Sequence, residues 1–300
     1  MPMPPERLPH DRLEAPLLRC AAGDLAPNVA LAQLLMQARD HGEAEAAFAG
    51  VLERLPREQA GRVHDAHDLW RDTPDAFDTI RGIISIVEDS PEGADSPEHW
   101  SAVFDRTANV SAVAGVALYT LGRDDLLLSA TREIADRLRE WRMLDRASAV
   151  LDLGCGSGRI VCAIADQVDF VVGADVSPAM LAAARERCRP RRNVSLVCTA
   201  GRDLAMFGPR AFDAVVAVDV FPYLVPAGLA ASHIGEAARV LKPGGRLAIL
   251  NFSYRGAFEL DRADVARMAQ DHGFDLVRAA IGDFSLWDGT TFLLQSTGRS

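Results

Sequence analysis

Two acidic residues and a run of alternating glycines are the groups in this sequence best suited to hold a small ligand. Asp152 closes an apolar run and is followed by Gly154-Cys155-Gly156-Ser157-Gly158 and then by a helical pattern. This order predicts a buried strand, a tight turn and a helix. Glycines leave the backbone bare, so a ligand can approach the strand end and the helix N-terminus. A glycine-rich connection that binds nothing is the alternative.

The second acid, Asp175, ends another apolar run 23 positions after Asp152. In a doubly wound sheet this carboxylate lies beside the first turn, where it can accept both hydroxyls of a ribose. The spacing G-x-G-x-G differs from the G-x-G-x-x-G of dinucleotide sites. An acid at the turn also repels phosphate and attracts a cation. The sequence therefore predicts a ligand that contains a nucleoside and a positive charge.

The half of the chain that follows Ser148 alternates strand and helix patterns. Strands are predicted at 148–153, 169–175, 194–199, 212–219, 246–252, 274–281 and 291–296, and helices at 157–167, 178–188, 228–241 and 261–272. Strands separated by helices require parallel crossovers with helices on both faces. We predict an α/β, Rossmann-like sheet of seven strands, preceded by an all-α N-terminal region.

Four segments in chain order resemble the class I S-adenosylmethionine-dependent methyltransferase family. They are Val150–Arg159, Gly173–Ser177, Ala211–Asp219 and Val240–Leu247. The resemblance covers about half of the chain, from Ser148 onwards. It implies the family's sheet with an antiparallel last strand, S-adenosyl-L-methionine as cofactor and S-adenosyl-L-homocysteine as product.

The resemblance also implies which residues contact the cofactor. Gly154, Gly156 and Gly158, with Cys155 between them, would admit the methionine portion, and Asp152 would hold its ammonium group directly or through water. The remaining implied contacts are Asp175 on the ribose, Val176 and Met180 on the adenine, and Asp219 at the end of the fourth strand. For Met180 a purely structural place in the core is an equal alternative.

The loop after the third strand departs from the family's pattern. Ala200 stands where the family has an acid that receives the adenine amino group. We expect backbone groups of Gly201 and Arg202, or the shifted carboxylate of Asp203, to take its place.

Methyl transfer from a sulfonium needs mainly positioning and exclusion of water, and a base only when the acceptor carries a proton. The candidate bases are Asp219, Tyr223, His233 and Tyr254, and no catalytic residue is assigned. A surface or capping role is favoured for His233, early in its helix. Tyr119, Tyr223 and Tyr254 are candidates to line the substrate side or its lid, with Trp100 and Phe104 as lid or packing residues. Lys242, the only lysine, is expected to be solvated at a helix end.

The composition of the chain limits the classes of molecule that it is expected to bind. The net charge is −10, which gives no diffuse positive field for nucleic acid or anionic lipid. No apolar run reaches the roughly 18 residues of a membrane span, and the first residues lack a signal core. The five cysteines show no metal-ligand spacing and predict reduced thiols in a cytoplasmic protein. We expect no metal site, no nucleic-acid partner and a small-molecule substrate.

Three regions are predicted: 1–90, helical; 91–145, a helical lid or connector; and 146–300, the S-adenosylmethionine-binding domain. The first region has helical patterns at 12–22, 27–41, 43–55, 57–70 and 74–87. The pair at 27–55 resembles one tetratricopeptide-like hairpin, and a single unit cannot bury its own face. A helical extension packed on the catalytic domain, or a homodimer through these helices, is favoured over a peptide-binding groove.

The sequence thus predicts methyl transfer from S-adenosylmethionine to a small molecule, at an oxygen, nitrogen or carbon atom. A non-catalytic S-adenosylmethionine-binding protein with a helical partner-binding module, and a protein methyltransferase, stay open. A dinucleotide oxidoreductase ranks last because of the turn spacing and Asp152.

Overall fold

The computed structural model describes residues 10–89 and 95–298, and the predicted boundary between residues 90 and 91 lies outside them. The chain divides into two compact units, which are described separately. Within the described residues, the sheet unit comprises 95–112, 128–284 and 289–298. The helical unit comprises 10–89, 113–127 and 285–288.

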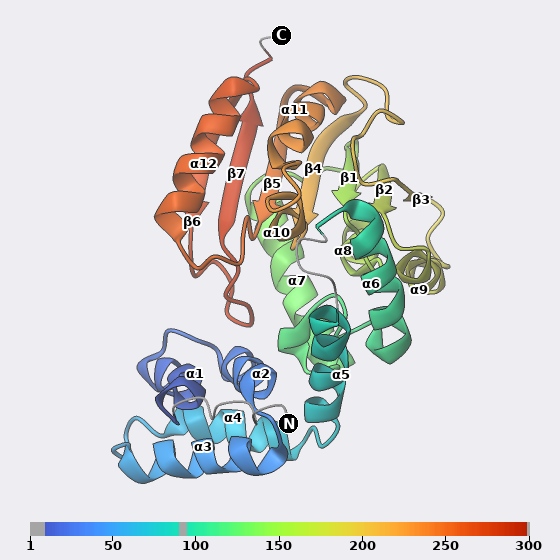
Figure 1. The fold of residues 1–300 in the computed structure, drawn as a ribbon. Coiled ribbons are helices and arrows are strands. Elements are labelled where there is room, and N and C mark those ends of the chain that lie inside the picture. The colour runs from blue at the N-terminus through green and yellow to red at the C-terminus, as the bar shows by residue number, and fades with distance from the viewer. Residues whose placement is uncertain (1–9, 90–94, 299–300) are drawn as a thin grey trace, which may run out of the picture. The chain divides into compact units, whose positions relative to one another are not determined.

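The sheet unit is built on a seven-stranded sheet with the order β3-β2-β1-β4-β5-β7-β6 (Figure 1). The strands are β1 Ala149–Leu153, β2 Phe170–Asp175, β3 Val194–Cys198, β4 Phe212–Val218, β5 Leu241–Leu250, β6 Phe274–Ala280 and β7 Thr291–Ser296. β1 to β5 run parallel, and β7 lies antiparallel between β5 and β6. The predicted α/β fold and its antiparallel last strand are therefore confirmed.

Helices cover both faces of this sheet, which explains why its central strands are continuous apolar runs. Val150 and Leu151 in β1 and Val215 and Val216 in β4 are all fully buried. The covering elements are α6 Pro97–Ser111, α7 Asp124–Glu140, α8 Arg159–Ile164, η2 Ala165–Gln167, α9 Pro178–Cys188, α10 Phe221–Leu224, α11 Ala230–Val240 and α12 Phe258–Asp271. The short helix α10, directly after β4, was not predicted.

The start of β5 differs from the prediction. The strand begins at Leu241, five residues before the predicted start at 246, and includes the turn-like residues Pro243 to Gly245 opposite an irregularity between Phe212 and Ala214. Lys242, expected to be only solvated, lies with its Nζ 2.7 Å from Asp213 Oδ2. The same oxygen accepts the backbone N–H of Ala149 at 2.8 Å. This ion pair therefore joins the starts of β1, β4 and β5.

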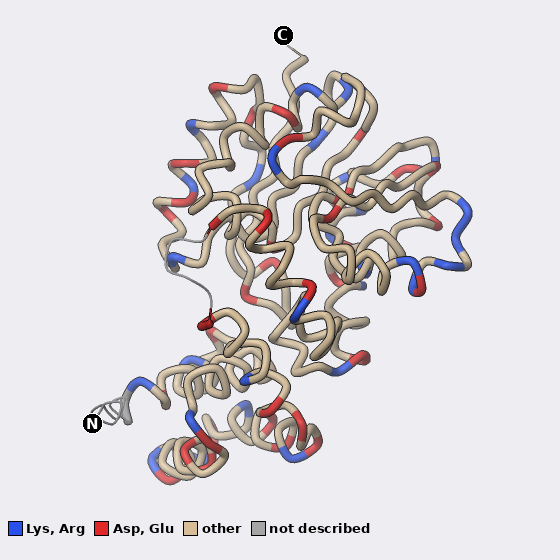
Figure 2. The backbone as a smooth tube through the Cα atoms, turned by 45° about the vertical axis from the view of Figure 1, so that its right-hand side comes forward, with Lys and Arg blue, Asp and Glu red and all other residues tan. Residues whose placement is uncertain are grey.

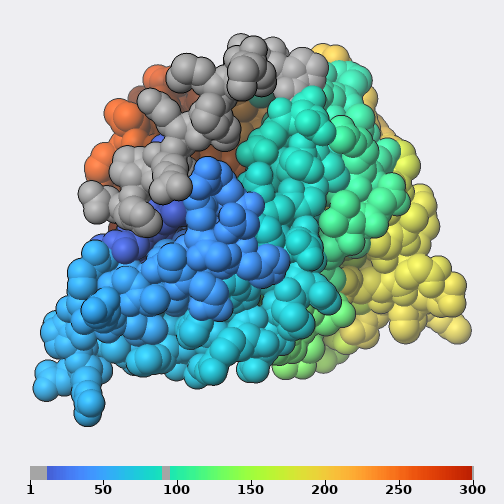
Figure 3. Space-filling view, turned by 60° about the horizontal axis from the view of Figure 1, so that its bottom comes forward, coloured from blue at the N-terminus to red at the C-terminus, as the bar shows by residue number. Residues whose placement is uncertain are grey.

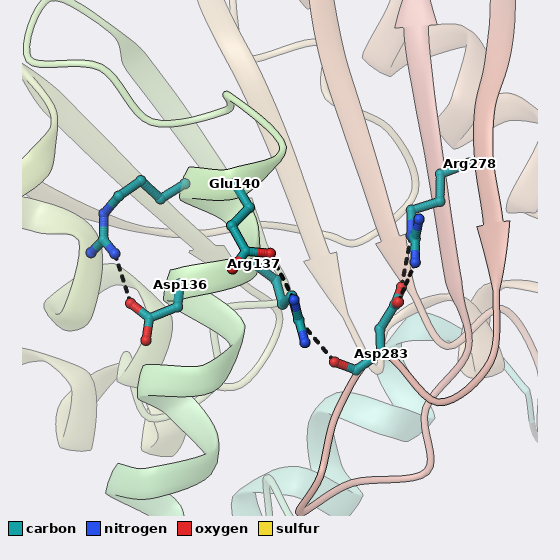
Figure 4. Close-up of polar contacts among 6 residues, drawn as sticks. Asp136, Arg137, Glu140, Arg278 and Asp283 are labelled. Carbon is teal, nitrogen blue, oxygen red and sulfur yellow. Dashed lines mark hydrogen bonds and ion pairs between the residues drawn. The ribbon is translucent and has the colours of Figure 1, made fainter.

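A hydrogen bond from Arg137 holds α7 to the connection between β6 and β7, and an ion pair lies on either side of it (Figure 4). Arg137 donates from Nε to the Asp283 carbonyl at 2.9 Å and from Nη1 to Glu140 at 2.7 Å. Arg278 binds the Asp283 carboxylate with two nitrogens. The helix that precedes β1 is thus fixed to the antiparallel edge of the sheet.

The helical unit contains α1 His10–Ala22, α2 Pro27–Gln37, α3 His41–Arg54, α4 Gly61–Arg71, α5 Ala76–Glu88 and the short η1 Leu118–Thr120. α2 packs chiefly against α1 and α4, and α3 chiefly against α1, so the main partners of the two helices of the predicted hairpin are other helices. Asn28, buried in α2, donates to the carbonyls of Tyr119 and Leu286, both at 2.9 Å. These bonds bring two later segments of the chain into the unit. Figure 3 shows in blue the surface that the first helices of the chain contribute to the face in view.

Charged residues of both signs are distributed along the whole backbone (Figure 2). The densest basic group lies at the end of α9, where five arginines fall between Arg185 and Arg192. Arg189 pairs with Glu186 at 2.8 Å and Arg191 with Asp166 at 2.6 Å. Part of this basic group is therefore compensated by nearby acids.

Candidate active site

The glycine bend after β1 is tied to the end of β2 by backbone hydrogen bonds. Gly154 and Cys155 both donate their N–H to the Ala174 carbonyl, at 2.7 and 3.0 Å. Gly156 donates to Asp175 Oδ2 at 2.7 Å. The three glycines of the bend have φ of 68°, 51° and 74°, a region that side chains rarely enter. The bend is therefore a fixed turn with its backbone held by the neighbouring strand.

Two of these glycines are required because neighbouring side chains of the protein leave no room for a Cβ atom. A Cβ on Gly154 would lie 2.2 Å from Val220 Cγ2, and one on Gly158 would lie 2.8 Å from Ala184 Cβ. The space beside Gly154 and Gly158 is thus filled by the protein, whereas the sequence analysis expected the glycines to make room for a ligand. The first of these distances also shows that Val220, in the segment after β4, lies directly against the bend.

Asp152 and Asp175 lie on neighbouring strands, and both side chains are buried. Asp152 Oδ2 has no hydrogen-bond partner among the described residues. Burial raises the pKa of Asp152 to about 7, against the opposing charge of Arg159 and with a contribution from Asp175. The end of β1 therefore presents a buried carboxyl group with one unsatisfied oxygen.

Asp175 differs, because both of its oxygens accept backbone N–H groups. Oδ2 binds Gly156 at 2.7 Å and Oδ1 binds Ser177 at 2.8 Å. Burial raises the pKa of Asp175, and these hydrogen bonds oppose the rise. Each oxygen still has a second lone pair for a further donor.

The residues predicted to surround an adenine come together beside Asp175. A Cβ on Gly201 would lie 2.6 Å from Val176 Cγ1 and 2.9 Å from Pro97 Cβ. Arg202 binds both oxygens of Glu98 at 2.8 Å. The shifted acid Asp203 is exposed and accepts the N–H of Ala205 at 3.0 Å, within its own turn.

Met180 and Cys155, two further predicted contacts, are packed in the interior. The Met180 side chain is almost fully buried, and its N–H is bound by Ser177 Oγ at 3.1 Å in the first turn of α9. Cys155 is also buried, which raises the pKa of its thiol well above the ordinary value. Both side chains are thus in positions typical of core residues.

Helix α6 lies over this end of the site. Ser101 Oγ donates to the Val176 carbonyl at 2.7 Å. Asp105 Oδ1 accepts from Ser177 Oγ at 2.6 Å and from the N–H of Ala179 at 2.9 Å. Asp105 therefore caps the N-terminus of α9 from another helix, where a negative charge is favourable. No sequence motif marks this residue, and the sequence analysis missed it.

The first residues after β4 and β5 form a second polar group. Asp219 and Asn251 have φ of 56° and 70°, which costs of order 1 kcal/mol or more for a residue with a side chain. Asn251 Nδ2 donates to Asp219 Oδ1 at 2.8 Å. Their own N–H groups bind the carbonyls of Leu250 at 2.9 Å and Thr290 at 2.7 Å. Two unusual backbone conformations are thus held side by side at adjacent strand ends.

Tyr223 and Tyr254, two of the predicted site residues, meet at this pair. The Tyr223 ring centroid lies 4.6 Å from that of Trp100, 5.2 Å from Phe104 and 6.0 Å from Tyr254. The Tyr254 hydroxyl hydrogen-bonds with Tyr223 and with Asp219. Burial raises the pKa of Tyr223 to about 12 and that of Tyr254 well above its ordinary value. We call Trp100, Phe104, Tyr223 and Tyr254 the aromatic cluster.

Two other sequence candidates lie in different surroundings. Tyr119 belongs to the helical unit, where it is buried and its ring stacks on Trp287 with centroids 6.0 Å apart. His233 is also buried, and its Nδ1 lies 3.0 Å from the Leu229 carbonyl of its own helix. Burial lowers the pKa of His233. The expected surface position of His233 was wrong, because this face of α11 packs on the sheet.

Within residues 10–89 and 95–298, no three His, Cys, Asp or Glu side chains are arranged to hold a metal ion. In the same part of the chain, no helix is both long and apolar enough to cross a membrane.

Comparison with known proteins agrees with this geometry. Residues 150–245 match the family described as methyltransferase domain. This segment of the chain, which runs from β1 to the start of β5, is therefore similar to a methyltransferase domain. The resemblance seen in its four sequence segments is thereby confirmed.

Curated proteins that are similar to this chain include demethylmenaquinone methyltransferases. That of Tropheryma whipplei is 34% identical over 154 residues, which are 51% of this chain and 62% of the relative. That of Thermus thermophilus is 36% identical over 115 residues, which are 37% of this chain and 51% of the relative. The chain thus spans less than two thirds of the length of these relatives.

Solved structures show the same fold at low identity. Haemonchus contortus phosphoethanolamine N-methyltransferase 1 matches 68% of this chain and half of its own, with a TM-score of 0.54 and 14% identity. The cyclase SpnF matches 67% of this chain and 96% of its own, with a TM-score of 0.51 and 18% identity. Because this fold also occurs in a cyclase, the reaction has to be argued from the site.

Gly158→Ala is expected to destabilise the protein by about 1–3 kcal/mol, since the added methyl meets Ala184 in a backbone conformation that disfavours side chains. Urea denaturation measures the change. Gly208→Ala is the control, because a Cβ there meets nothing within 4 Å. Equal stability of the two variants would contradict the packing described for the bend.

Asp105→Ala is expected to loosen α6, because it removes two hydrogen bonds to the start of α9. Glu98→Ala on the same helix removes an exposed ion pair with Arg202, which is worth little. Hydrogen exchange of α6 amides should increase in the first variant and stay near the wild-type rate in the second. Identical exchange in both variants would remove Asp105 as the anchor of α6.

Proposed function

We propose that this chain is an enzyme that transfers a methyl group from S-adenosylmethionine to a small-molecule acceptor. The observation that carries the proposal is the buried, unpartnered Asp152 Oδ2 beside the glycine bend. A carboxylate in such a place is costly unless a positive group joins it. The ammonium group of the cofactor's methionine portion is such a group, bound directly or through water.

The other proposed contacts follow from the geometry of the site. Asp175 has lone pairs left for the two ribose hydroxyls, and it is held in place by its bonds to Gly156 and Ser177. Val176 and Gly201 would flank the adenine, with Arg202 beside them and α6 excluding water. Met180 would support this surface from the core. The cofactor supplies an electrophilic methyl group on a sulfonium.

A small acceptor is supported by helix α6, which is hydrogen-bonded to Val176 and to the start of α9 beside the proposed cofactor site. Relatives named as demethylmenaquinone methyltransferases point in the same direction. All five cysteines are free thiols, in keeping with the predicted cytoplasmic location.

The helical unit is proposed to mediate a homodimer. Leu18 in α1 and Val87 in α5 are exposed apolar residues of this unit, and burying such surface favours association. Sedimentation of the full chain should give twice the mass of 32.4 kDa. A monomer at micromolar concentration would reject this proposal and leave the methyltransferase proposal unaffected.

Asp175→Ala is expected to weaken the binding of S-adenosylhomocysteine by about 1.5–3 kcal/mol, because hydrogen bonds to a charged group are lost. Isothermal titration calorimetry measures this change, and circular dichroism checks that the variant is folded. Asp166→Ala, which removes an exposed acid paired with Arg191, serves as the control. Binding of NAD in place of either S-adenosyl compound by the wild type would reject the proposed function.

The affinity for S-adenosylhomocysteine is expected to depend on pH through Asp152. Its pKa of about 7 in the free protein means that the carboxyl is mostly protonated below this pH, whereas an ammonium ligand binds the ionised form. Affinity should therefore fall as pH decreases from 7.5 to 5.5, approaching about tenfold per unit. Asp152→Asn should weaken binding at pH 7.5 and flatten the profile. The same slope in both proteins would exclude Asp152 from contact with the ammonium group.

A further inference from the structure

We infer that Asp105 is a positioning residue for cofactor binding, and that it acts through Ser177 on the carboxylate of Asp175. Helix α6, which carries Asp105, thereby links the cofactor side of the site to the aromatic cluster. The inference rests on the proposed function, because it takes Asp175 as the residue that binds the ribose. Asp105 itself is not proposed to touch the cofactor or the acceptor.

A continuous series of hydrogen bonds joins α6 to the glycine bend. Asp105 Oδ1 accepts from Ser177 Oγ at 2.6 Å. The N–H of Ser177 donates to Asp175 Oδ1 at 2.8 Å, and Asp175 Oδ2 accepts from the N–H of Gly156 at 2.7 Å. The series therefore runs from a helix that precedes the sheet in the chain, through the end of β2, to the turn after β1.

Ser177 has a fixed orientation in this series, because each of its polar groups has a partner. A carboxylate can only accept hydrogen bonds, so the single hydroxyl hydrogen of Ser177 points to Asp105. The hydroxyl oxygen accepts from the N–H of Met180 at 3.1 Å, and the Ser177 carbonyl accepts from that of Leu181 at 3.1 Å. Because Ser177 is fully buried, a hydroxyl that lost its partner there would be left unsatisfied.

Helix α6 is anchored to the same turn at two residues. The carboxylate oxygen of Asp105 that binds Ser177 also accepts the N–H of Ala179 at 2.9 Å. Ser101, one helical turn earlier, donates from Oγ to the Val176 carbonyl at 2.7 Å. Ser101 and Asp105 are thus the two anchoring residues of α6, and both bind the segment between β2 and the first turn of α9.

The effect of Asp105 on Asp175 is geometric, because its charge acts in the opposite sense. Burial raises the pKa of Asp175, and the negative charge of Asp105 adds to this rise. The charge of Asp105 therefore disfavours the ionised form of Asp175. Its hydrogen bonds, by contrast, hold the turn and with it the carboxylate of Asp175 in position. An asparagine at position 105 would keep an accepting oxygen and lose the charge.

A neighbouring row of side chains on α6 belongs to the aromatic cluster. Trp100 and Phe104 each directly precede one of the two anchoring residues, so the two pairs form adjacent rows along the helix. The ring centroids of Trp100 and Phe104 lie 4.6 and 5.2 Å from that of Tyr223. A ligand that fixes the turn at Asp175 therefore also fixes α6 and its side of the aromatic cluster, and this coupling is reciprocal.

The test measures the affinity of the full chain for S-adenosylhomocysteine by calorimetry. Asp105→Ala should bind about fivefold more weakly than the wild type, because the turn is less often in its binding conformation. Asp105→Asn should bind within about twofold of the wild type, since asparagine caps a helix as well as aspartate does. Asn109→Ala, which removes an exposed side chain from the same helix, is the control and should bind like the wild type.

A double-mutant cycle shows whether Asp105 acts through Asp175. In the Asp175→Ala background the carboxylate that Ser177 holds is absent, so adding Asp105→Ala should lower the affinity by about twofold or less. Independent contributions would instead add, and the second substitution would cost about fivefold in both backgrounds.

Hydrogen exchange provides a second readout, which the wild type alone can give. Saturating S-adenosylhomocysteine should slow the exchange of α6 amides by about fivefold, because the coupling is reciprocal. In Asp105→Ala the ligand should slow α6 much less, while it still slows the amides of the glycine bend. Circular dichroism checks that this variant is folded, and if it is not, the exchange of α6 in the wild type decides.

Four results would overturn the inference while the proposed function stands. They are an unchanged affinity in Asp105→Ala, an equal loss in Asp105→Asn and Asp105→Ala, losses that add in the double variant, and exchange of α6 that bound S-adenosylhomocysteine does not slow. A wild type that fails to bind S-adenosylhomocysteine at all would overturn both.

Discussion

The site depends on the carboxylate of Asp175, which holds two turns together. Its oxygens accept from Gly156 in the bend after β1 and from Ser177 before α9. Without this link, the bend would be held to β2 only by the hydrogen bonds from Gly154 and Cys155 to the Ala174 carbonyl. A ligand group bound to Asp175 therefore has a fixed position relative to the bend. This fixed position would align the two ends of a long cofactor.

At the ends of β4 and β5, a single side-chain hydrogen bond likewise links two turns. Asp219 and Asn251 stabilise each other's left-handed conformations with one side-chain hydrogen bond. Because Val220 touches the glycine bend, the segment after β4 that begins with Asp219 is positioned by the same contact that fills the space above Gly154. The same contact therefore packs the bend and places the segment that follows β4.

The sequence predicted the sheet because its strands are apolar runs bounded by glycines and acids, and these patterns depend on short-range order. The sequence also predicted that Asp152, Asp175 and the glycines lie close together, since all are at the carboxyl ends of adjacent parallel strands. It could not find Asp105 or the pairing of Asn251 with Asp219, which depend on contacts 74 and 32 residues apart. Burial of His233 was missed for a related reason: a histidine in an amphipathic helix does not reveal which face meets the sheet.

A crystal structure of the full chain with S-adenosylhomocysteine bound tests the central claim most directly. The account predicts the ammonium group within hydrogen-bond reach of Asp152 or bridged to it by one water, and the ribose hydroxyls on Asp175 with its bonds to Gly156 and Ser177 intact. The adenine should lie between Val176 and Gly201. A ligand bound away from the glycine bend, or a ribose that leaves Asp175 untouched, would contradict the account.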